Sequence, residues 1–93
     1  MEFQFDRHIL ERAKERGTDI EEIKDVIQTG FDIQAKYGRK GKAKIFEFNN
    51  LRHGKFYVHK RVEVIFIIEG DRIIVVTVYV FYGRWELKNE STL

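Results

Sequence analysis

The stretch that decides the fold is VEVIFIIEGDRIIVVTVYV, at positions 62–80. Two runs rich in β-branched residues flank Gly70-Asp71, and such a dipeptide between apolar runs is typical of a tight hairpin turn. A two-residue loop sets Glu69 opposite Arg72 and so fixes the register along both strands. The sequence therefore predicts an antiparallel hairpin of two strands, Arg61–Glu69 and Arg72–Tyr82.

This register determines which residues share a face of the hairpin. It places His59 opposite Tyr82, and side chains then alternate between the two faces. The better core face carries Val62, Val64, Phe66, Ile68, Ile73, Val75, Thr77 and Tyr79. The other face still holds five aliphatic residues, which predicts burial against a ligand or a second copy, hence a homodimer. These residues are Ile65, Ile67, Ile74, Val76 and Val78.

Two helices and further strands complete the expected fold. Asp6–Arg16 has apolar residues at helical spacing and ends before Gly17, and the stretch from Asp19 to Gly30 opens with a capping box. Residues 31–44 read as a basic loop or a poorly formed strand. Strands are predicted at Lys44–Asn49 and Lys55–His59, the latter separate from the hairpin or continuous with it. We expect an α+β fold, with two N-terminal helices packed on one face of a 3–4 stranded antiparallel sheet, as a single domain of residues 1–93.

Charge is distributed unevenly along the chain. Residues 36–61 hold nine Lys/Arg and one acid, Glu47, whereas the remaining residues hold eight Lys/Arg and fourteen Asp/Glu. Clustered cations in a folded domain attract polyanions, of which nucleic acid is the commonest large one. The alternative is a solvated basic segment without a partner. The cations predicted to contact RNA are Lys36, Arg39, Lys40, Lys42, Lys44, Lys60 and Arg61.

Composition and spacing disfavour several classes of function. The chain has no cysteine, which excludes thiolate sites and fits a reducing cytoplasm. The three histidines lack zinc-motif spacing, no carboxylate pair is placed to hold magnesium, and no glycine-rich phosphate loop precedes a helix. We therefore expect no metal and no cofactor. The longest nonpolar stretch, Val64–Glu69, is far shorter than the ~20 residues of a membrane span, so no membrane partner is expected.

Candidate catalytic residues occur in two groups. The first helix carries a row at four-residue spacing, and a predicted strand carries a second group with a tyrosine opposite. Histidine and tyrosine exchange protons and cations stabilise phosphate charge, as metal-free RNA cleavage through the 2′-hydroxyl requires. The alternative is that these side chains only decorate an exposed surface. The two groups are His8, Arg12 and Arg16, and His59, Lys60, Arg61 and Tyr82.

The segment HILERAKERG resembles a known family. His8, Arg12 and Arg16-Gly17 match its pattern of a His, an Arg four residues on, then Arg-Gly, and both DIEEIKDVIQTG at 19–30 and the hairpin are similar. The family consists of small bacterial and archaeal proteins called domain of unknown function 4258 (DUF4258). Its topology is similar to that of the RelE-type and BrnT-type toxin ribonucleases. The resemblance implies a two-helix, antiparallel-sheet domain with a toxin-like endoribonuclease role, and it adds Thr77 and Tyr79 to the matched positions.

Two hypotheses of different classes follow. The first is a small cytoplasmic RNA-binding protein that acts as a metal-independent, toxin-like endoribonuclease. The second is a noncatalytic interaction module, either a homodimer or one half of a two-component complex whose acidic, antitoxin-like partner covers the basic segment. In the predicted register, Thr77 and Tyr79 lie on the opposite face from His59 and Tyr82. Convergence of the candidate residues in one cleft distinguishes the two hypotheses, because catalysis requires it.

Overall fold

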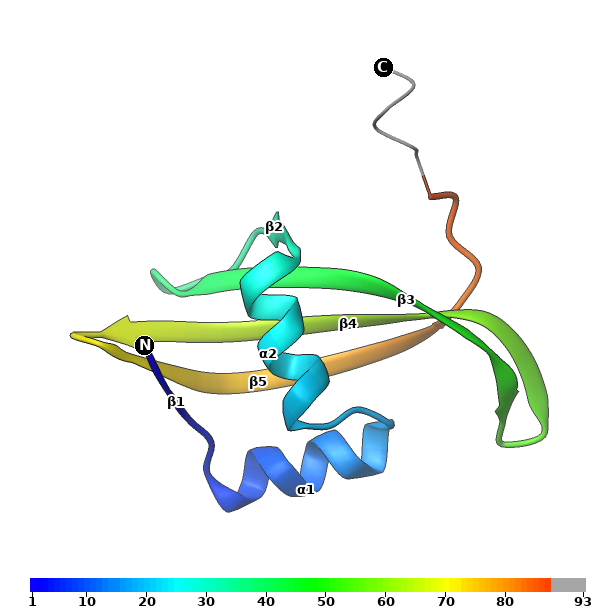
Figure 1. Cartoon of the computed structure of the whole chain (residues 1–93), viewed down its shortest axis with the longest axis horizontal. Coiled ribbons are helices and arrows are strands. Elements are labelled where there is room, and N and C mark those ends of the chain that lie inside the picture. The colour runs from blue at the N-terminus through cyan, green and yellow to red at the C-terminus, as the bar shows by residue number, and fades with distance from the viewer. Residues whose placement is uncertain (88–93) are drawn as a thin grey trace.

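The computed structural model describes residues 1–87 of the 93-residue chain. Its elements are β1 (Glu2–Gln4), α1 (Arg7–Arg16), α2 (Ile20–Thr29), β2 (Phe31–Ile33), β3 (Lys40–Arg52), β4 (Lys55–Glu69) and β5 (Arg72–Gly83). Figure 1 shows the three long strands side by side, with α2 crossing in front of them and α1 beside β5. The protein therefore has an α+β fold.

The strands form one mixed sheet in the order β1-β5-β4-β3-β2, with β1 parallel to β5 and the other pairs antiparallel. The prediction of three or four antiparallel strands was wrong because β1 and β2 have only three residues each. Three residues are too few to show the alternation of apolar and polar side chains from which strands are predicted. Such short strands form by pairing with long neighbours. The two strands predicted on either side of Lys60 are one continuous strand, β4.

The predicted hairpin is present, but it contains a β-bulge. Its turn sets Glu69 opposite Arg72, as expected. Further along, Phe66 pairs with Val75 while Ile65 pairs with Thr77, so Val76 is an extra residue in β5. The bulge shifts every later pair by one position.

The shifted register exchanges residues between the two faces of the sheet. His59 lies opposite Gly83, and Lys60, not His59, lies opposite Tyr82. Thr77 and Tyr79 consequently leave the predicted core face and share the open face with His59. Val78, which we had placed on the open face, is in the core and only 1% exposed.

Both helices begin and end as their sequences predict. The Asp6 side chain accepts a hydrogen bond from the Ile9 amide at the start of α1, and Asp19 accepts one from the Glu22 amide at the start of α2. Gly17 ends α1 in the left-handed conformation, with φ of 92°. An added Cβ at Gly17 would also collide with the Tyr82 hydroxyl, so this position requires glycine for two reasons.

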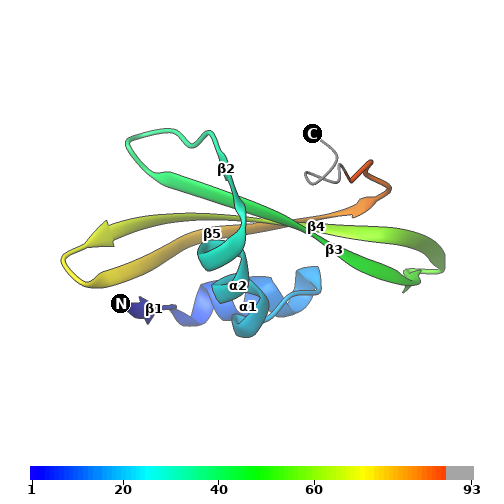
Figure 2. The same cartoon turned by 45° about the horizontal axis from the view of Figure 1, so that its top comes forward.

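The core lies between the helices and one face of the sheet. Figure 2 shows α1 and α2 below the sheet and the β2–β3 connection rising on the other side. The buried cluster joins Ile9, Ala13, Ile23, Val26 and Ile27 of the helices to Val62, Val64, Phe66, Ile73, Val75 and Val78 of the sheet. Neither of the two helices within residues 1–87 covers the other face of the sheet, here called the open face.

Candidate functional site

A groove of 240 Å³ lies between the open face and the loop that joins β2 to β3. The loop contributes two cations and a tyrosine, and β4 and β5 supply the floor. The residues that line the groove are Gln34, Ala35, Lys36, Tyr37, Arg39, Ile65, Thr77 and Tyr79. Here it is called the loop groove. It brings Lys36 and Arg39 of the basic segment together with Thr77 and Tyr79 from the hairpin.

The loop is shaped by a tight turn at Tyr37-Gly38. Both residues have positive φ, 61° and 70°, and the Arg39 amide donates to the Lys36 carbonyl at 3.2 Å. A left-handed tyrosine is unusual, because its Cβ approaches the backbone more closely than in the ordinary conformations. The Tyr37 ring is nevertheless 86% exposed and lies against the Arg39 guanidinium, 5.8 Å from ring centre to carbon. Sequence reasoning missed this residue, although Tyr-Gly within a basic loop is a turn signal.

Arg16 reaches the same part of the sheet from the end of α1. Its guanidinium donates a hydrogen bond to the Val78 carbonyl of β5, and it lies 5.6 Å from the centre of the Tyr79 ring. Tyr79 is 43% exposed and stacks on Phe81, the next residue on that face. The structure therefore brings together two of the predicted catalytic residues, Arg16 and Tyr79.

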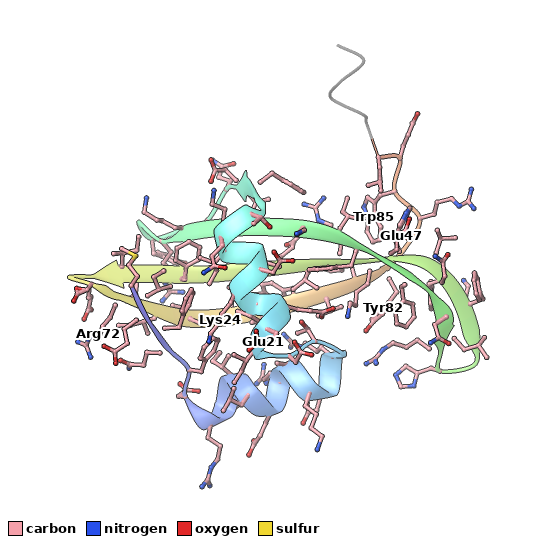
Figure 3. The ribbon with its side chains drawn as sticks, in the orientation of Figure 1. Glu21, Lys24, Glu47, Arg72, Tyr82 and Trp85 are labelled. Atoms are coloured by element: carbon pink, nitrogen blue, oxygen red, sulfur yellow. The ribbon has the colours of Figure 1, made fainter. Side chains whose placement is uncertain are left out.

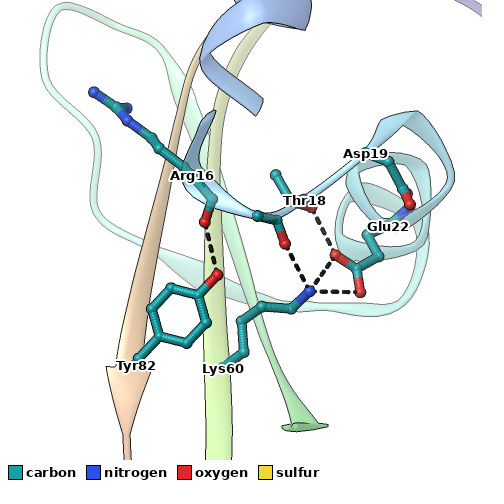
Figure 4. Close-up of polar contacts among 7 residues, drawn as sticks. Arg16, Thr18, Asp19, Glu22, Lys60 and Tyr82 are labelled. Carbon is teal, nitrogen blue, oxygen red and sulfur yellow. Dashed lines mark hydrogen bonds and ion pairs between the residues drawn. The ribbon is translucent and has the colours of Figure 1, made fainter. Parts of the chain in front are cut away.

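Three side chains from the sheet hold the last turn of α1. Tyr82 donates to the Arg16 carbonyl at 2.7 Å, Lys60 to the Gly17 carbonyl at 2.9 Å, and Arg52 to the Glu15 carbonyl at 2.7 Å. Two of these bonds are drawn in Figure 4. Carbonyls at a helix C-terminus lack partners within the helix and carry negative partial charge, so cationic donors stabilise them. These contacts fix the backbone from which the Arg16 side chain extends.

Lys60 is part of a buried polar junction below the sheet. Its residue is only 8% exposed, and its ammonium also contacts both Glu22 carboxylate oxygens at 2.8 and 2.9 Å. The Thr18 hydroxyl donates to the same carboxylate at 2.8 Å. Because Lys60 and Tyr82 are engaged by the helices, they lie on the opposite side of the sheet from the loop groove. Burial raises the pKa of the Tyr82 hydroxyl, and the Arg52 charge offsets part of that rise.

The histidines lie outside the loop groove. His8, like Arg12, is exposed on α1. His59 is on the open face but only 9% exposed, and its Nδ1 accepts a hydrogen bond from the Trp85 amide at 3.0 Å. Figure 3 shows Trp85 near Glu47, the residue paired with His59 on β3. Through this bond the His59 imidazole holds Trp85, two residues after the end of β5.

The seven predicted RNA-contacting cations fall into two sets. Four of them form ion pairs. Lys42 pairs with Asp32 at 2.7 Å and Lys44 with Asp25 at 2.8 Å. Lys60 pairs with Glu22 and Arg61 with Glu63, both at 2.8 Å. The hydrogen bonds from Lys44 and Lys42 lower the pKa of the Asp25 and Asp32 carboxyls respectively. Within residues 1–87, no ion pair engages Lys36, Arg39 or Lys40, and all three lie at or beside the β2–β3 loop.

The described part of the chain offers neither a metal site nor a membrane-spanning helix. Residues 1–87 contain no group of three or more His, Cys, Asp or Glu side chains placed to hold a metal ion. Among the same residues, no helix is both long enough and apolar enough to cross a membrane.

Comparison with known protein families gives a match over most of the chain. A family model described as "Domain of unknown function (DUF4258)" matches residues 5–80. Neither the curated proteins nor the solved structures include a match to this chain. The matched range contains every residue that lines the loop groove, together with Arg16.

Proposed function

The chain belongs to the DUF4258 family, whose description assigns no activity, and we propose from the geometry of the loop groove that it binds single-stranded RNA there. The observation that carries the proposal is the convergence of exposed tyrosines with cations that form no ion pair within residues 1–87. Lys36 and Arg39 approach the open face from the loop, and Arg16 approaches it across the edge of β5.

The chemistry of the groove suits an unpaired strand. Cations along a groove attract phosphates, and aromatic faces stack with bases that are not held in a duplex. Tyr37 and Tyr79 present exposed rings, and each has an arginine beside it, Arg39 and Arg16 respectively. Each pair offers a ring for a base and a guanidinium group for a phosphate, the two kinds of group that a single strand presents.

The proposal extends to metal-independent RNA cleavage in the same groove. In that reaction the 2′-oxygen attacks phosphorus after losing its proton, and the 5′-oxygen leaves and gains a proton, which gives a 2′,3′-cyclic phosphate. Arg16 would stabilise the added negative charge on the phosphate, and the Tyr79 hydroxyl would exchange a proton. This assignment moves the chemistry from the histidines to Arg16 and Tyr79, since no histidine lines the loop groove, whereas Tyr79 lines it and Arg16 lies 5.6 Å from the Tyr79 ring.

Binding is tested by fluorescence anisotropy with a labelled single-stranded RNA at several salt concentrations. We expect the double variant Lys36→Ala/Arg39→Ala to bind more weakly and to reduce the slope of log K against log salt by roughly 1.4, about 0.7 for each lost phosphate contact. Arg7→Ala/Lys14→Ala is the matched control, because it removes the same charge from the exposed surface of α1. Equal weakening by the two double variants would show that only net charge matters.

Cleavage is tested with the same RNA in EDTA. We expect 2′,3′-cyclic phosphate ends, no cleavage of the corresponding DNA, and rates lowered by about 10²-fold in Arg16→Ala and in Tyr79→Phe. His8→Ala and His59→Ala separate this assignment from catalysis by histidine. RNA that stays intact from pH 5 to 9 while still bound would limit the function to binding.

A noncatalytic interaction module is the second candidate, and a specific feature favours it. Phe31, Tyr79 and Phe81 are each more than 40% exposed, on β2 and β5, and Arg61 of the open face lies over the Phe31 ring at 5.2 Å. Exposed aromatic rings on one face are typical of surfaces that a partner covers, either a second copy or an acidic protein. Sedimentation of the wild type and of Phe81→Lys tests the homodimer: we expect a dimer for the first and a monomer for the second. A wild-type protein that is monomeric at high concentration would remove it.

A further inference from the structure

A second and larger groove, of 530 Å³, lies on the helix side of the sheet. It occupies the end where β3 and β5 begin and β4 ends, and Figure 1 shows these strand ends extending beyond α2. Because the helices stop short of this end, part of the sheet face that they cover elsewhere is left accessible. We call this space the end groove.

The floor of the end groove is apolar. Ile27 of α2, Phe66 and Ile68 of β4, and Ile73 of β5 line it. Three of them are at most 8% exposed and belong to the core, whereas Ile68 is 41% exposed. The floor therefore consists of core residues together with the accessible side chain of Ile68. A hydrocarbon chain that binds to this surface would be removed from water.

The rim of the same groove is basic. Arg39, Lys40 and Lys42 line it with one carboxylate, Asp32, which is bonded to Lys42. Three cations and one anion leave a net charge of +2. Lys40 has no ion pair within residues 1–87, so its ammonium is available to a ligand.

We propose that the end groove binds an amphipathic carboxylate, with its aliphatic chain on the isoleucine floor and its carboxylate bonded to Lys40. The volume falls within the roughly 300–1,000 Å³ typical of small-molecule sites, and the groove combines an apolar floor with a charged rim, as an amphipathic ligand requires. The carboxylate accepts a hydrogen bond from the ammonium of Lys40, which has no ion pair within residues 1–87. The apolar tail of the ligand covers Ile68.

Three probes of matched structure test this site by calorimetry or by amide chemical shifts at constant ionic strength. Decanoate carries both the chain and the carboxylate, decanol has the chain without the charge, and acetate has the charge without the chain. We expect saturable binding of decanoate, binding of decanol weaker by about 10-fold because the charge-assisted bond is lost, and none of acetate. Equal binding of decanol, or binding of acetate as strong as that of decanoate, would overturn the proposal.

Two variants locate the bound molecule. Lys40→Gln removes the charge at the rim, and Ile68→Asn makes the floor polar at a position exposed enough to tolerate the change. Each should weaken decanoate binding about 5- to 10-fold, whereas Lys55→Gln, on the exposed start of β4, should not alter it. Unchanged affinity in both variants, with native circular dichroism, would contradict the assignment.

The outcome can be separated from that of the RNA proposal. Arg39 lines both grooves and is left unchanged here, while Lys40 and Ile68 line only the end groove. Ile68→Asn should therefore retain the wild-type affinity for RNA. Loss of decanoate binding with RNA binding intact would confirm two distinct sites.

Discussion

Lys60 and Lys40 come from the same basic segment, yet their surroundings are opposite. Lys60 lies below the sheet, 8% exposed, with its ammonium bonded to Glu22 and to the end of α1. Lys40 is exposed beside the β2–β3 loop and has no ion pair within residues 1–87. The comparison shows that local charge density measures neither the field outside the protein nor the number of cations available to a ligand. Carboxylates from acidic segments distant in the sequence, such as Glu22, form ion pairs with some of these cations and neutralise their charge.

The largest expected effect on stability comes from replacing Lys60, the buried lysine of the two. Lys60→Ala leaves the Glu22 carboxylate partly buried without its cation and frees the Gly17 carbonyl. We expect a loss of about 3–5 kcal/mol in the free energy of unfolding, measured with urea. Lys40→Ala is the matched control, and we expect it to change the same quantity by less than about 0.5 kcal/mol. A loss of similar size in both variants would remove the distinction between the two regions.

A smaller effect is expected at the bond between Tyr82 and α1. Tyr82→Phe removes the hydroxyl that donates to the Arg16 carbonyl, while the ring remains packed against Phe48 and Tyr57. We expect a loss of about 1 kcal/mol in unfolding free energy, typical of one hydrogen bond. RNA affinity should fall as well, because the backbone that carries Arg16 is less firmly held. Unaltered affinity in this variant would show that the bond does not position Arg16.

The same tyrosine predicts a dependence on alkaline pH. Its pKa in the folded protein is raised by burial above the ordinary value of 10.0. The folded state holds the proton more tightly, so the resulting stability is complete below pH 10 and is lost as pH rises through the folded pKa. We expect the unfolding free energy of the wild type to decline above pH 10 more steeply than that of Tyr82→Phe. Parallel curves for the two proteins would contradict this, and Tyr37→Phe, at a highly exposed tyrosine, serves as the control.

The smallest effect is expected at the loop, and its sign is opposite. Tyr37→Asn replaces a left-handed tyrosine by a residue that adopts this conformation more readily, so stability should rise by about 0.5–1 kcal/mol. RNA affinity should fall, because the exposed ring is lost. A variant that gains stability and keeps full affinity would exclude Tyr37 from the binding surface. The surroundings of Lys60 and the β2–β3 loop would then differ only in whether their cations form ion pairs.

Features governed by near neighbours were predictable from sequence. The hairpin turn at Gly70-Asp71, the helix starts at Asp6 and Asp19, and the end of α1 at Gly17 all agree with the structure. Each depends on residues within a few positions of one another, since caps and turns are closed by local hydrogen bonds. The α+β class followed from the change of hydrophobic period after Gly30.

The sequence by itself also determined that cations are concentrated between positions 36 and 61 and that the hairpin carries the tyrosines Tyr79 and Tyr82. Only the tertiary structure decided which of them meet. The bulge at Val76 moves Thr77 and Tyr79 to the open face, Glu22 neutralises Lys60 from α2, and the loop places Lys36 and Arg39 over β4 and β5. These outcomes depend on pairing and packing between segments far apart in the chain, where a shift of one residue exchanges the two faces of a strand.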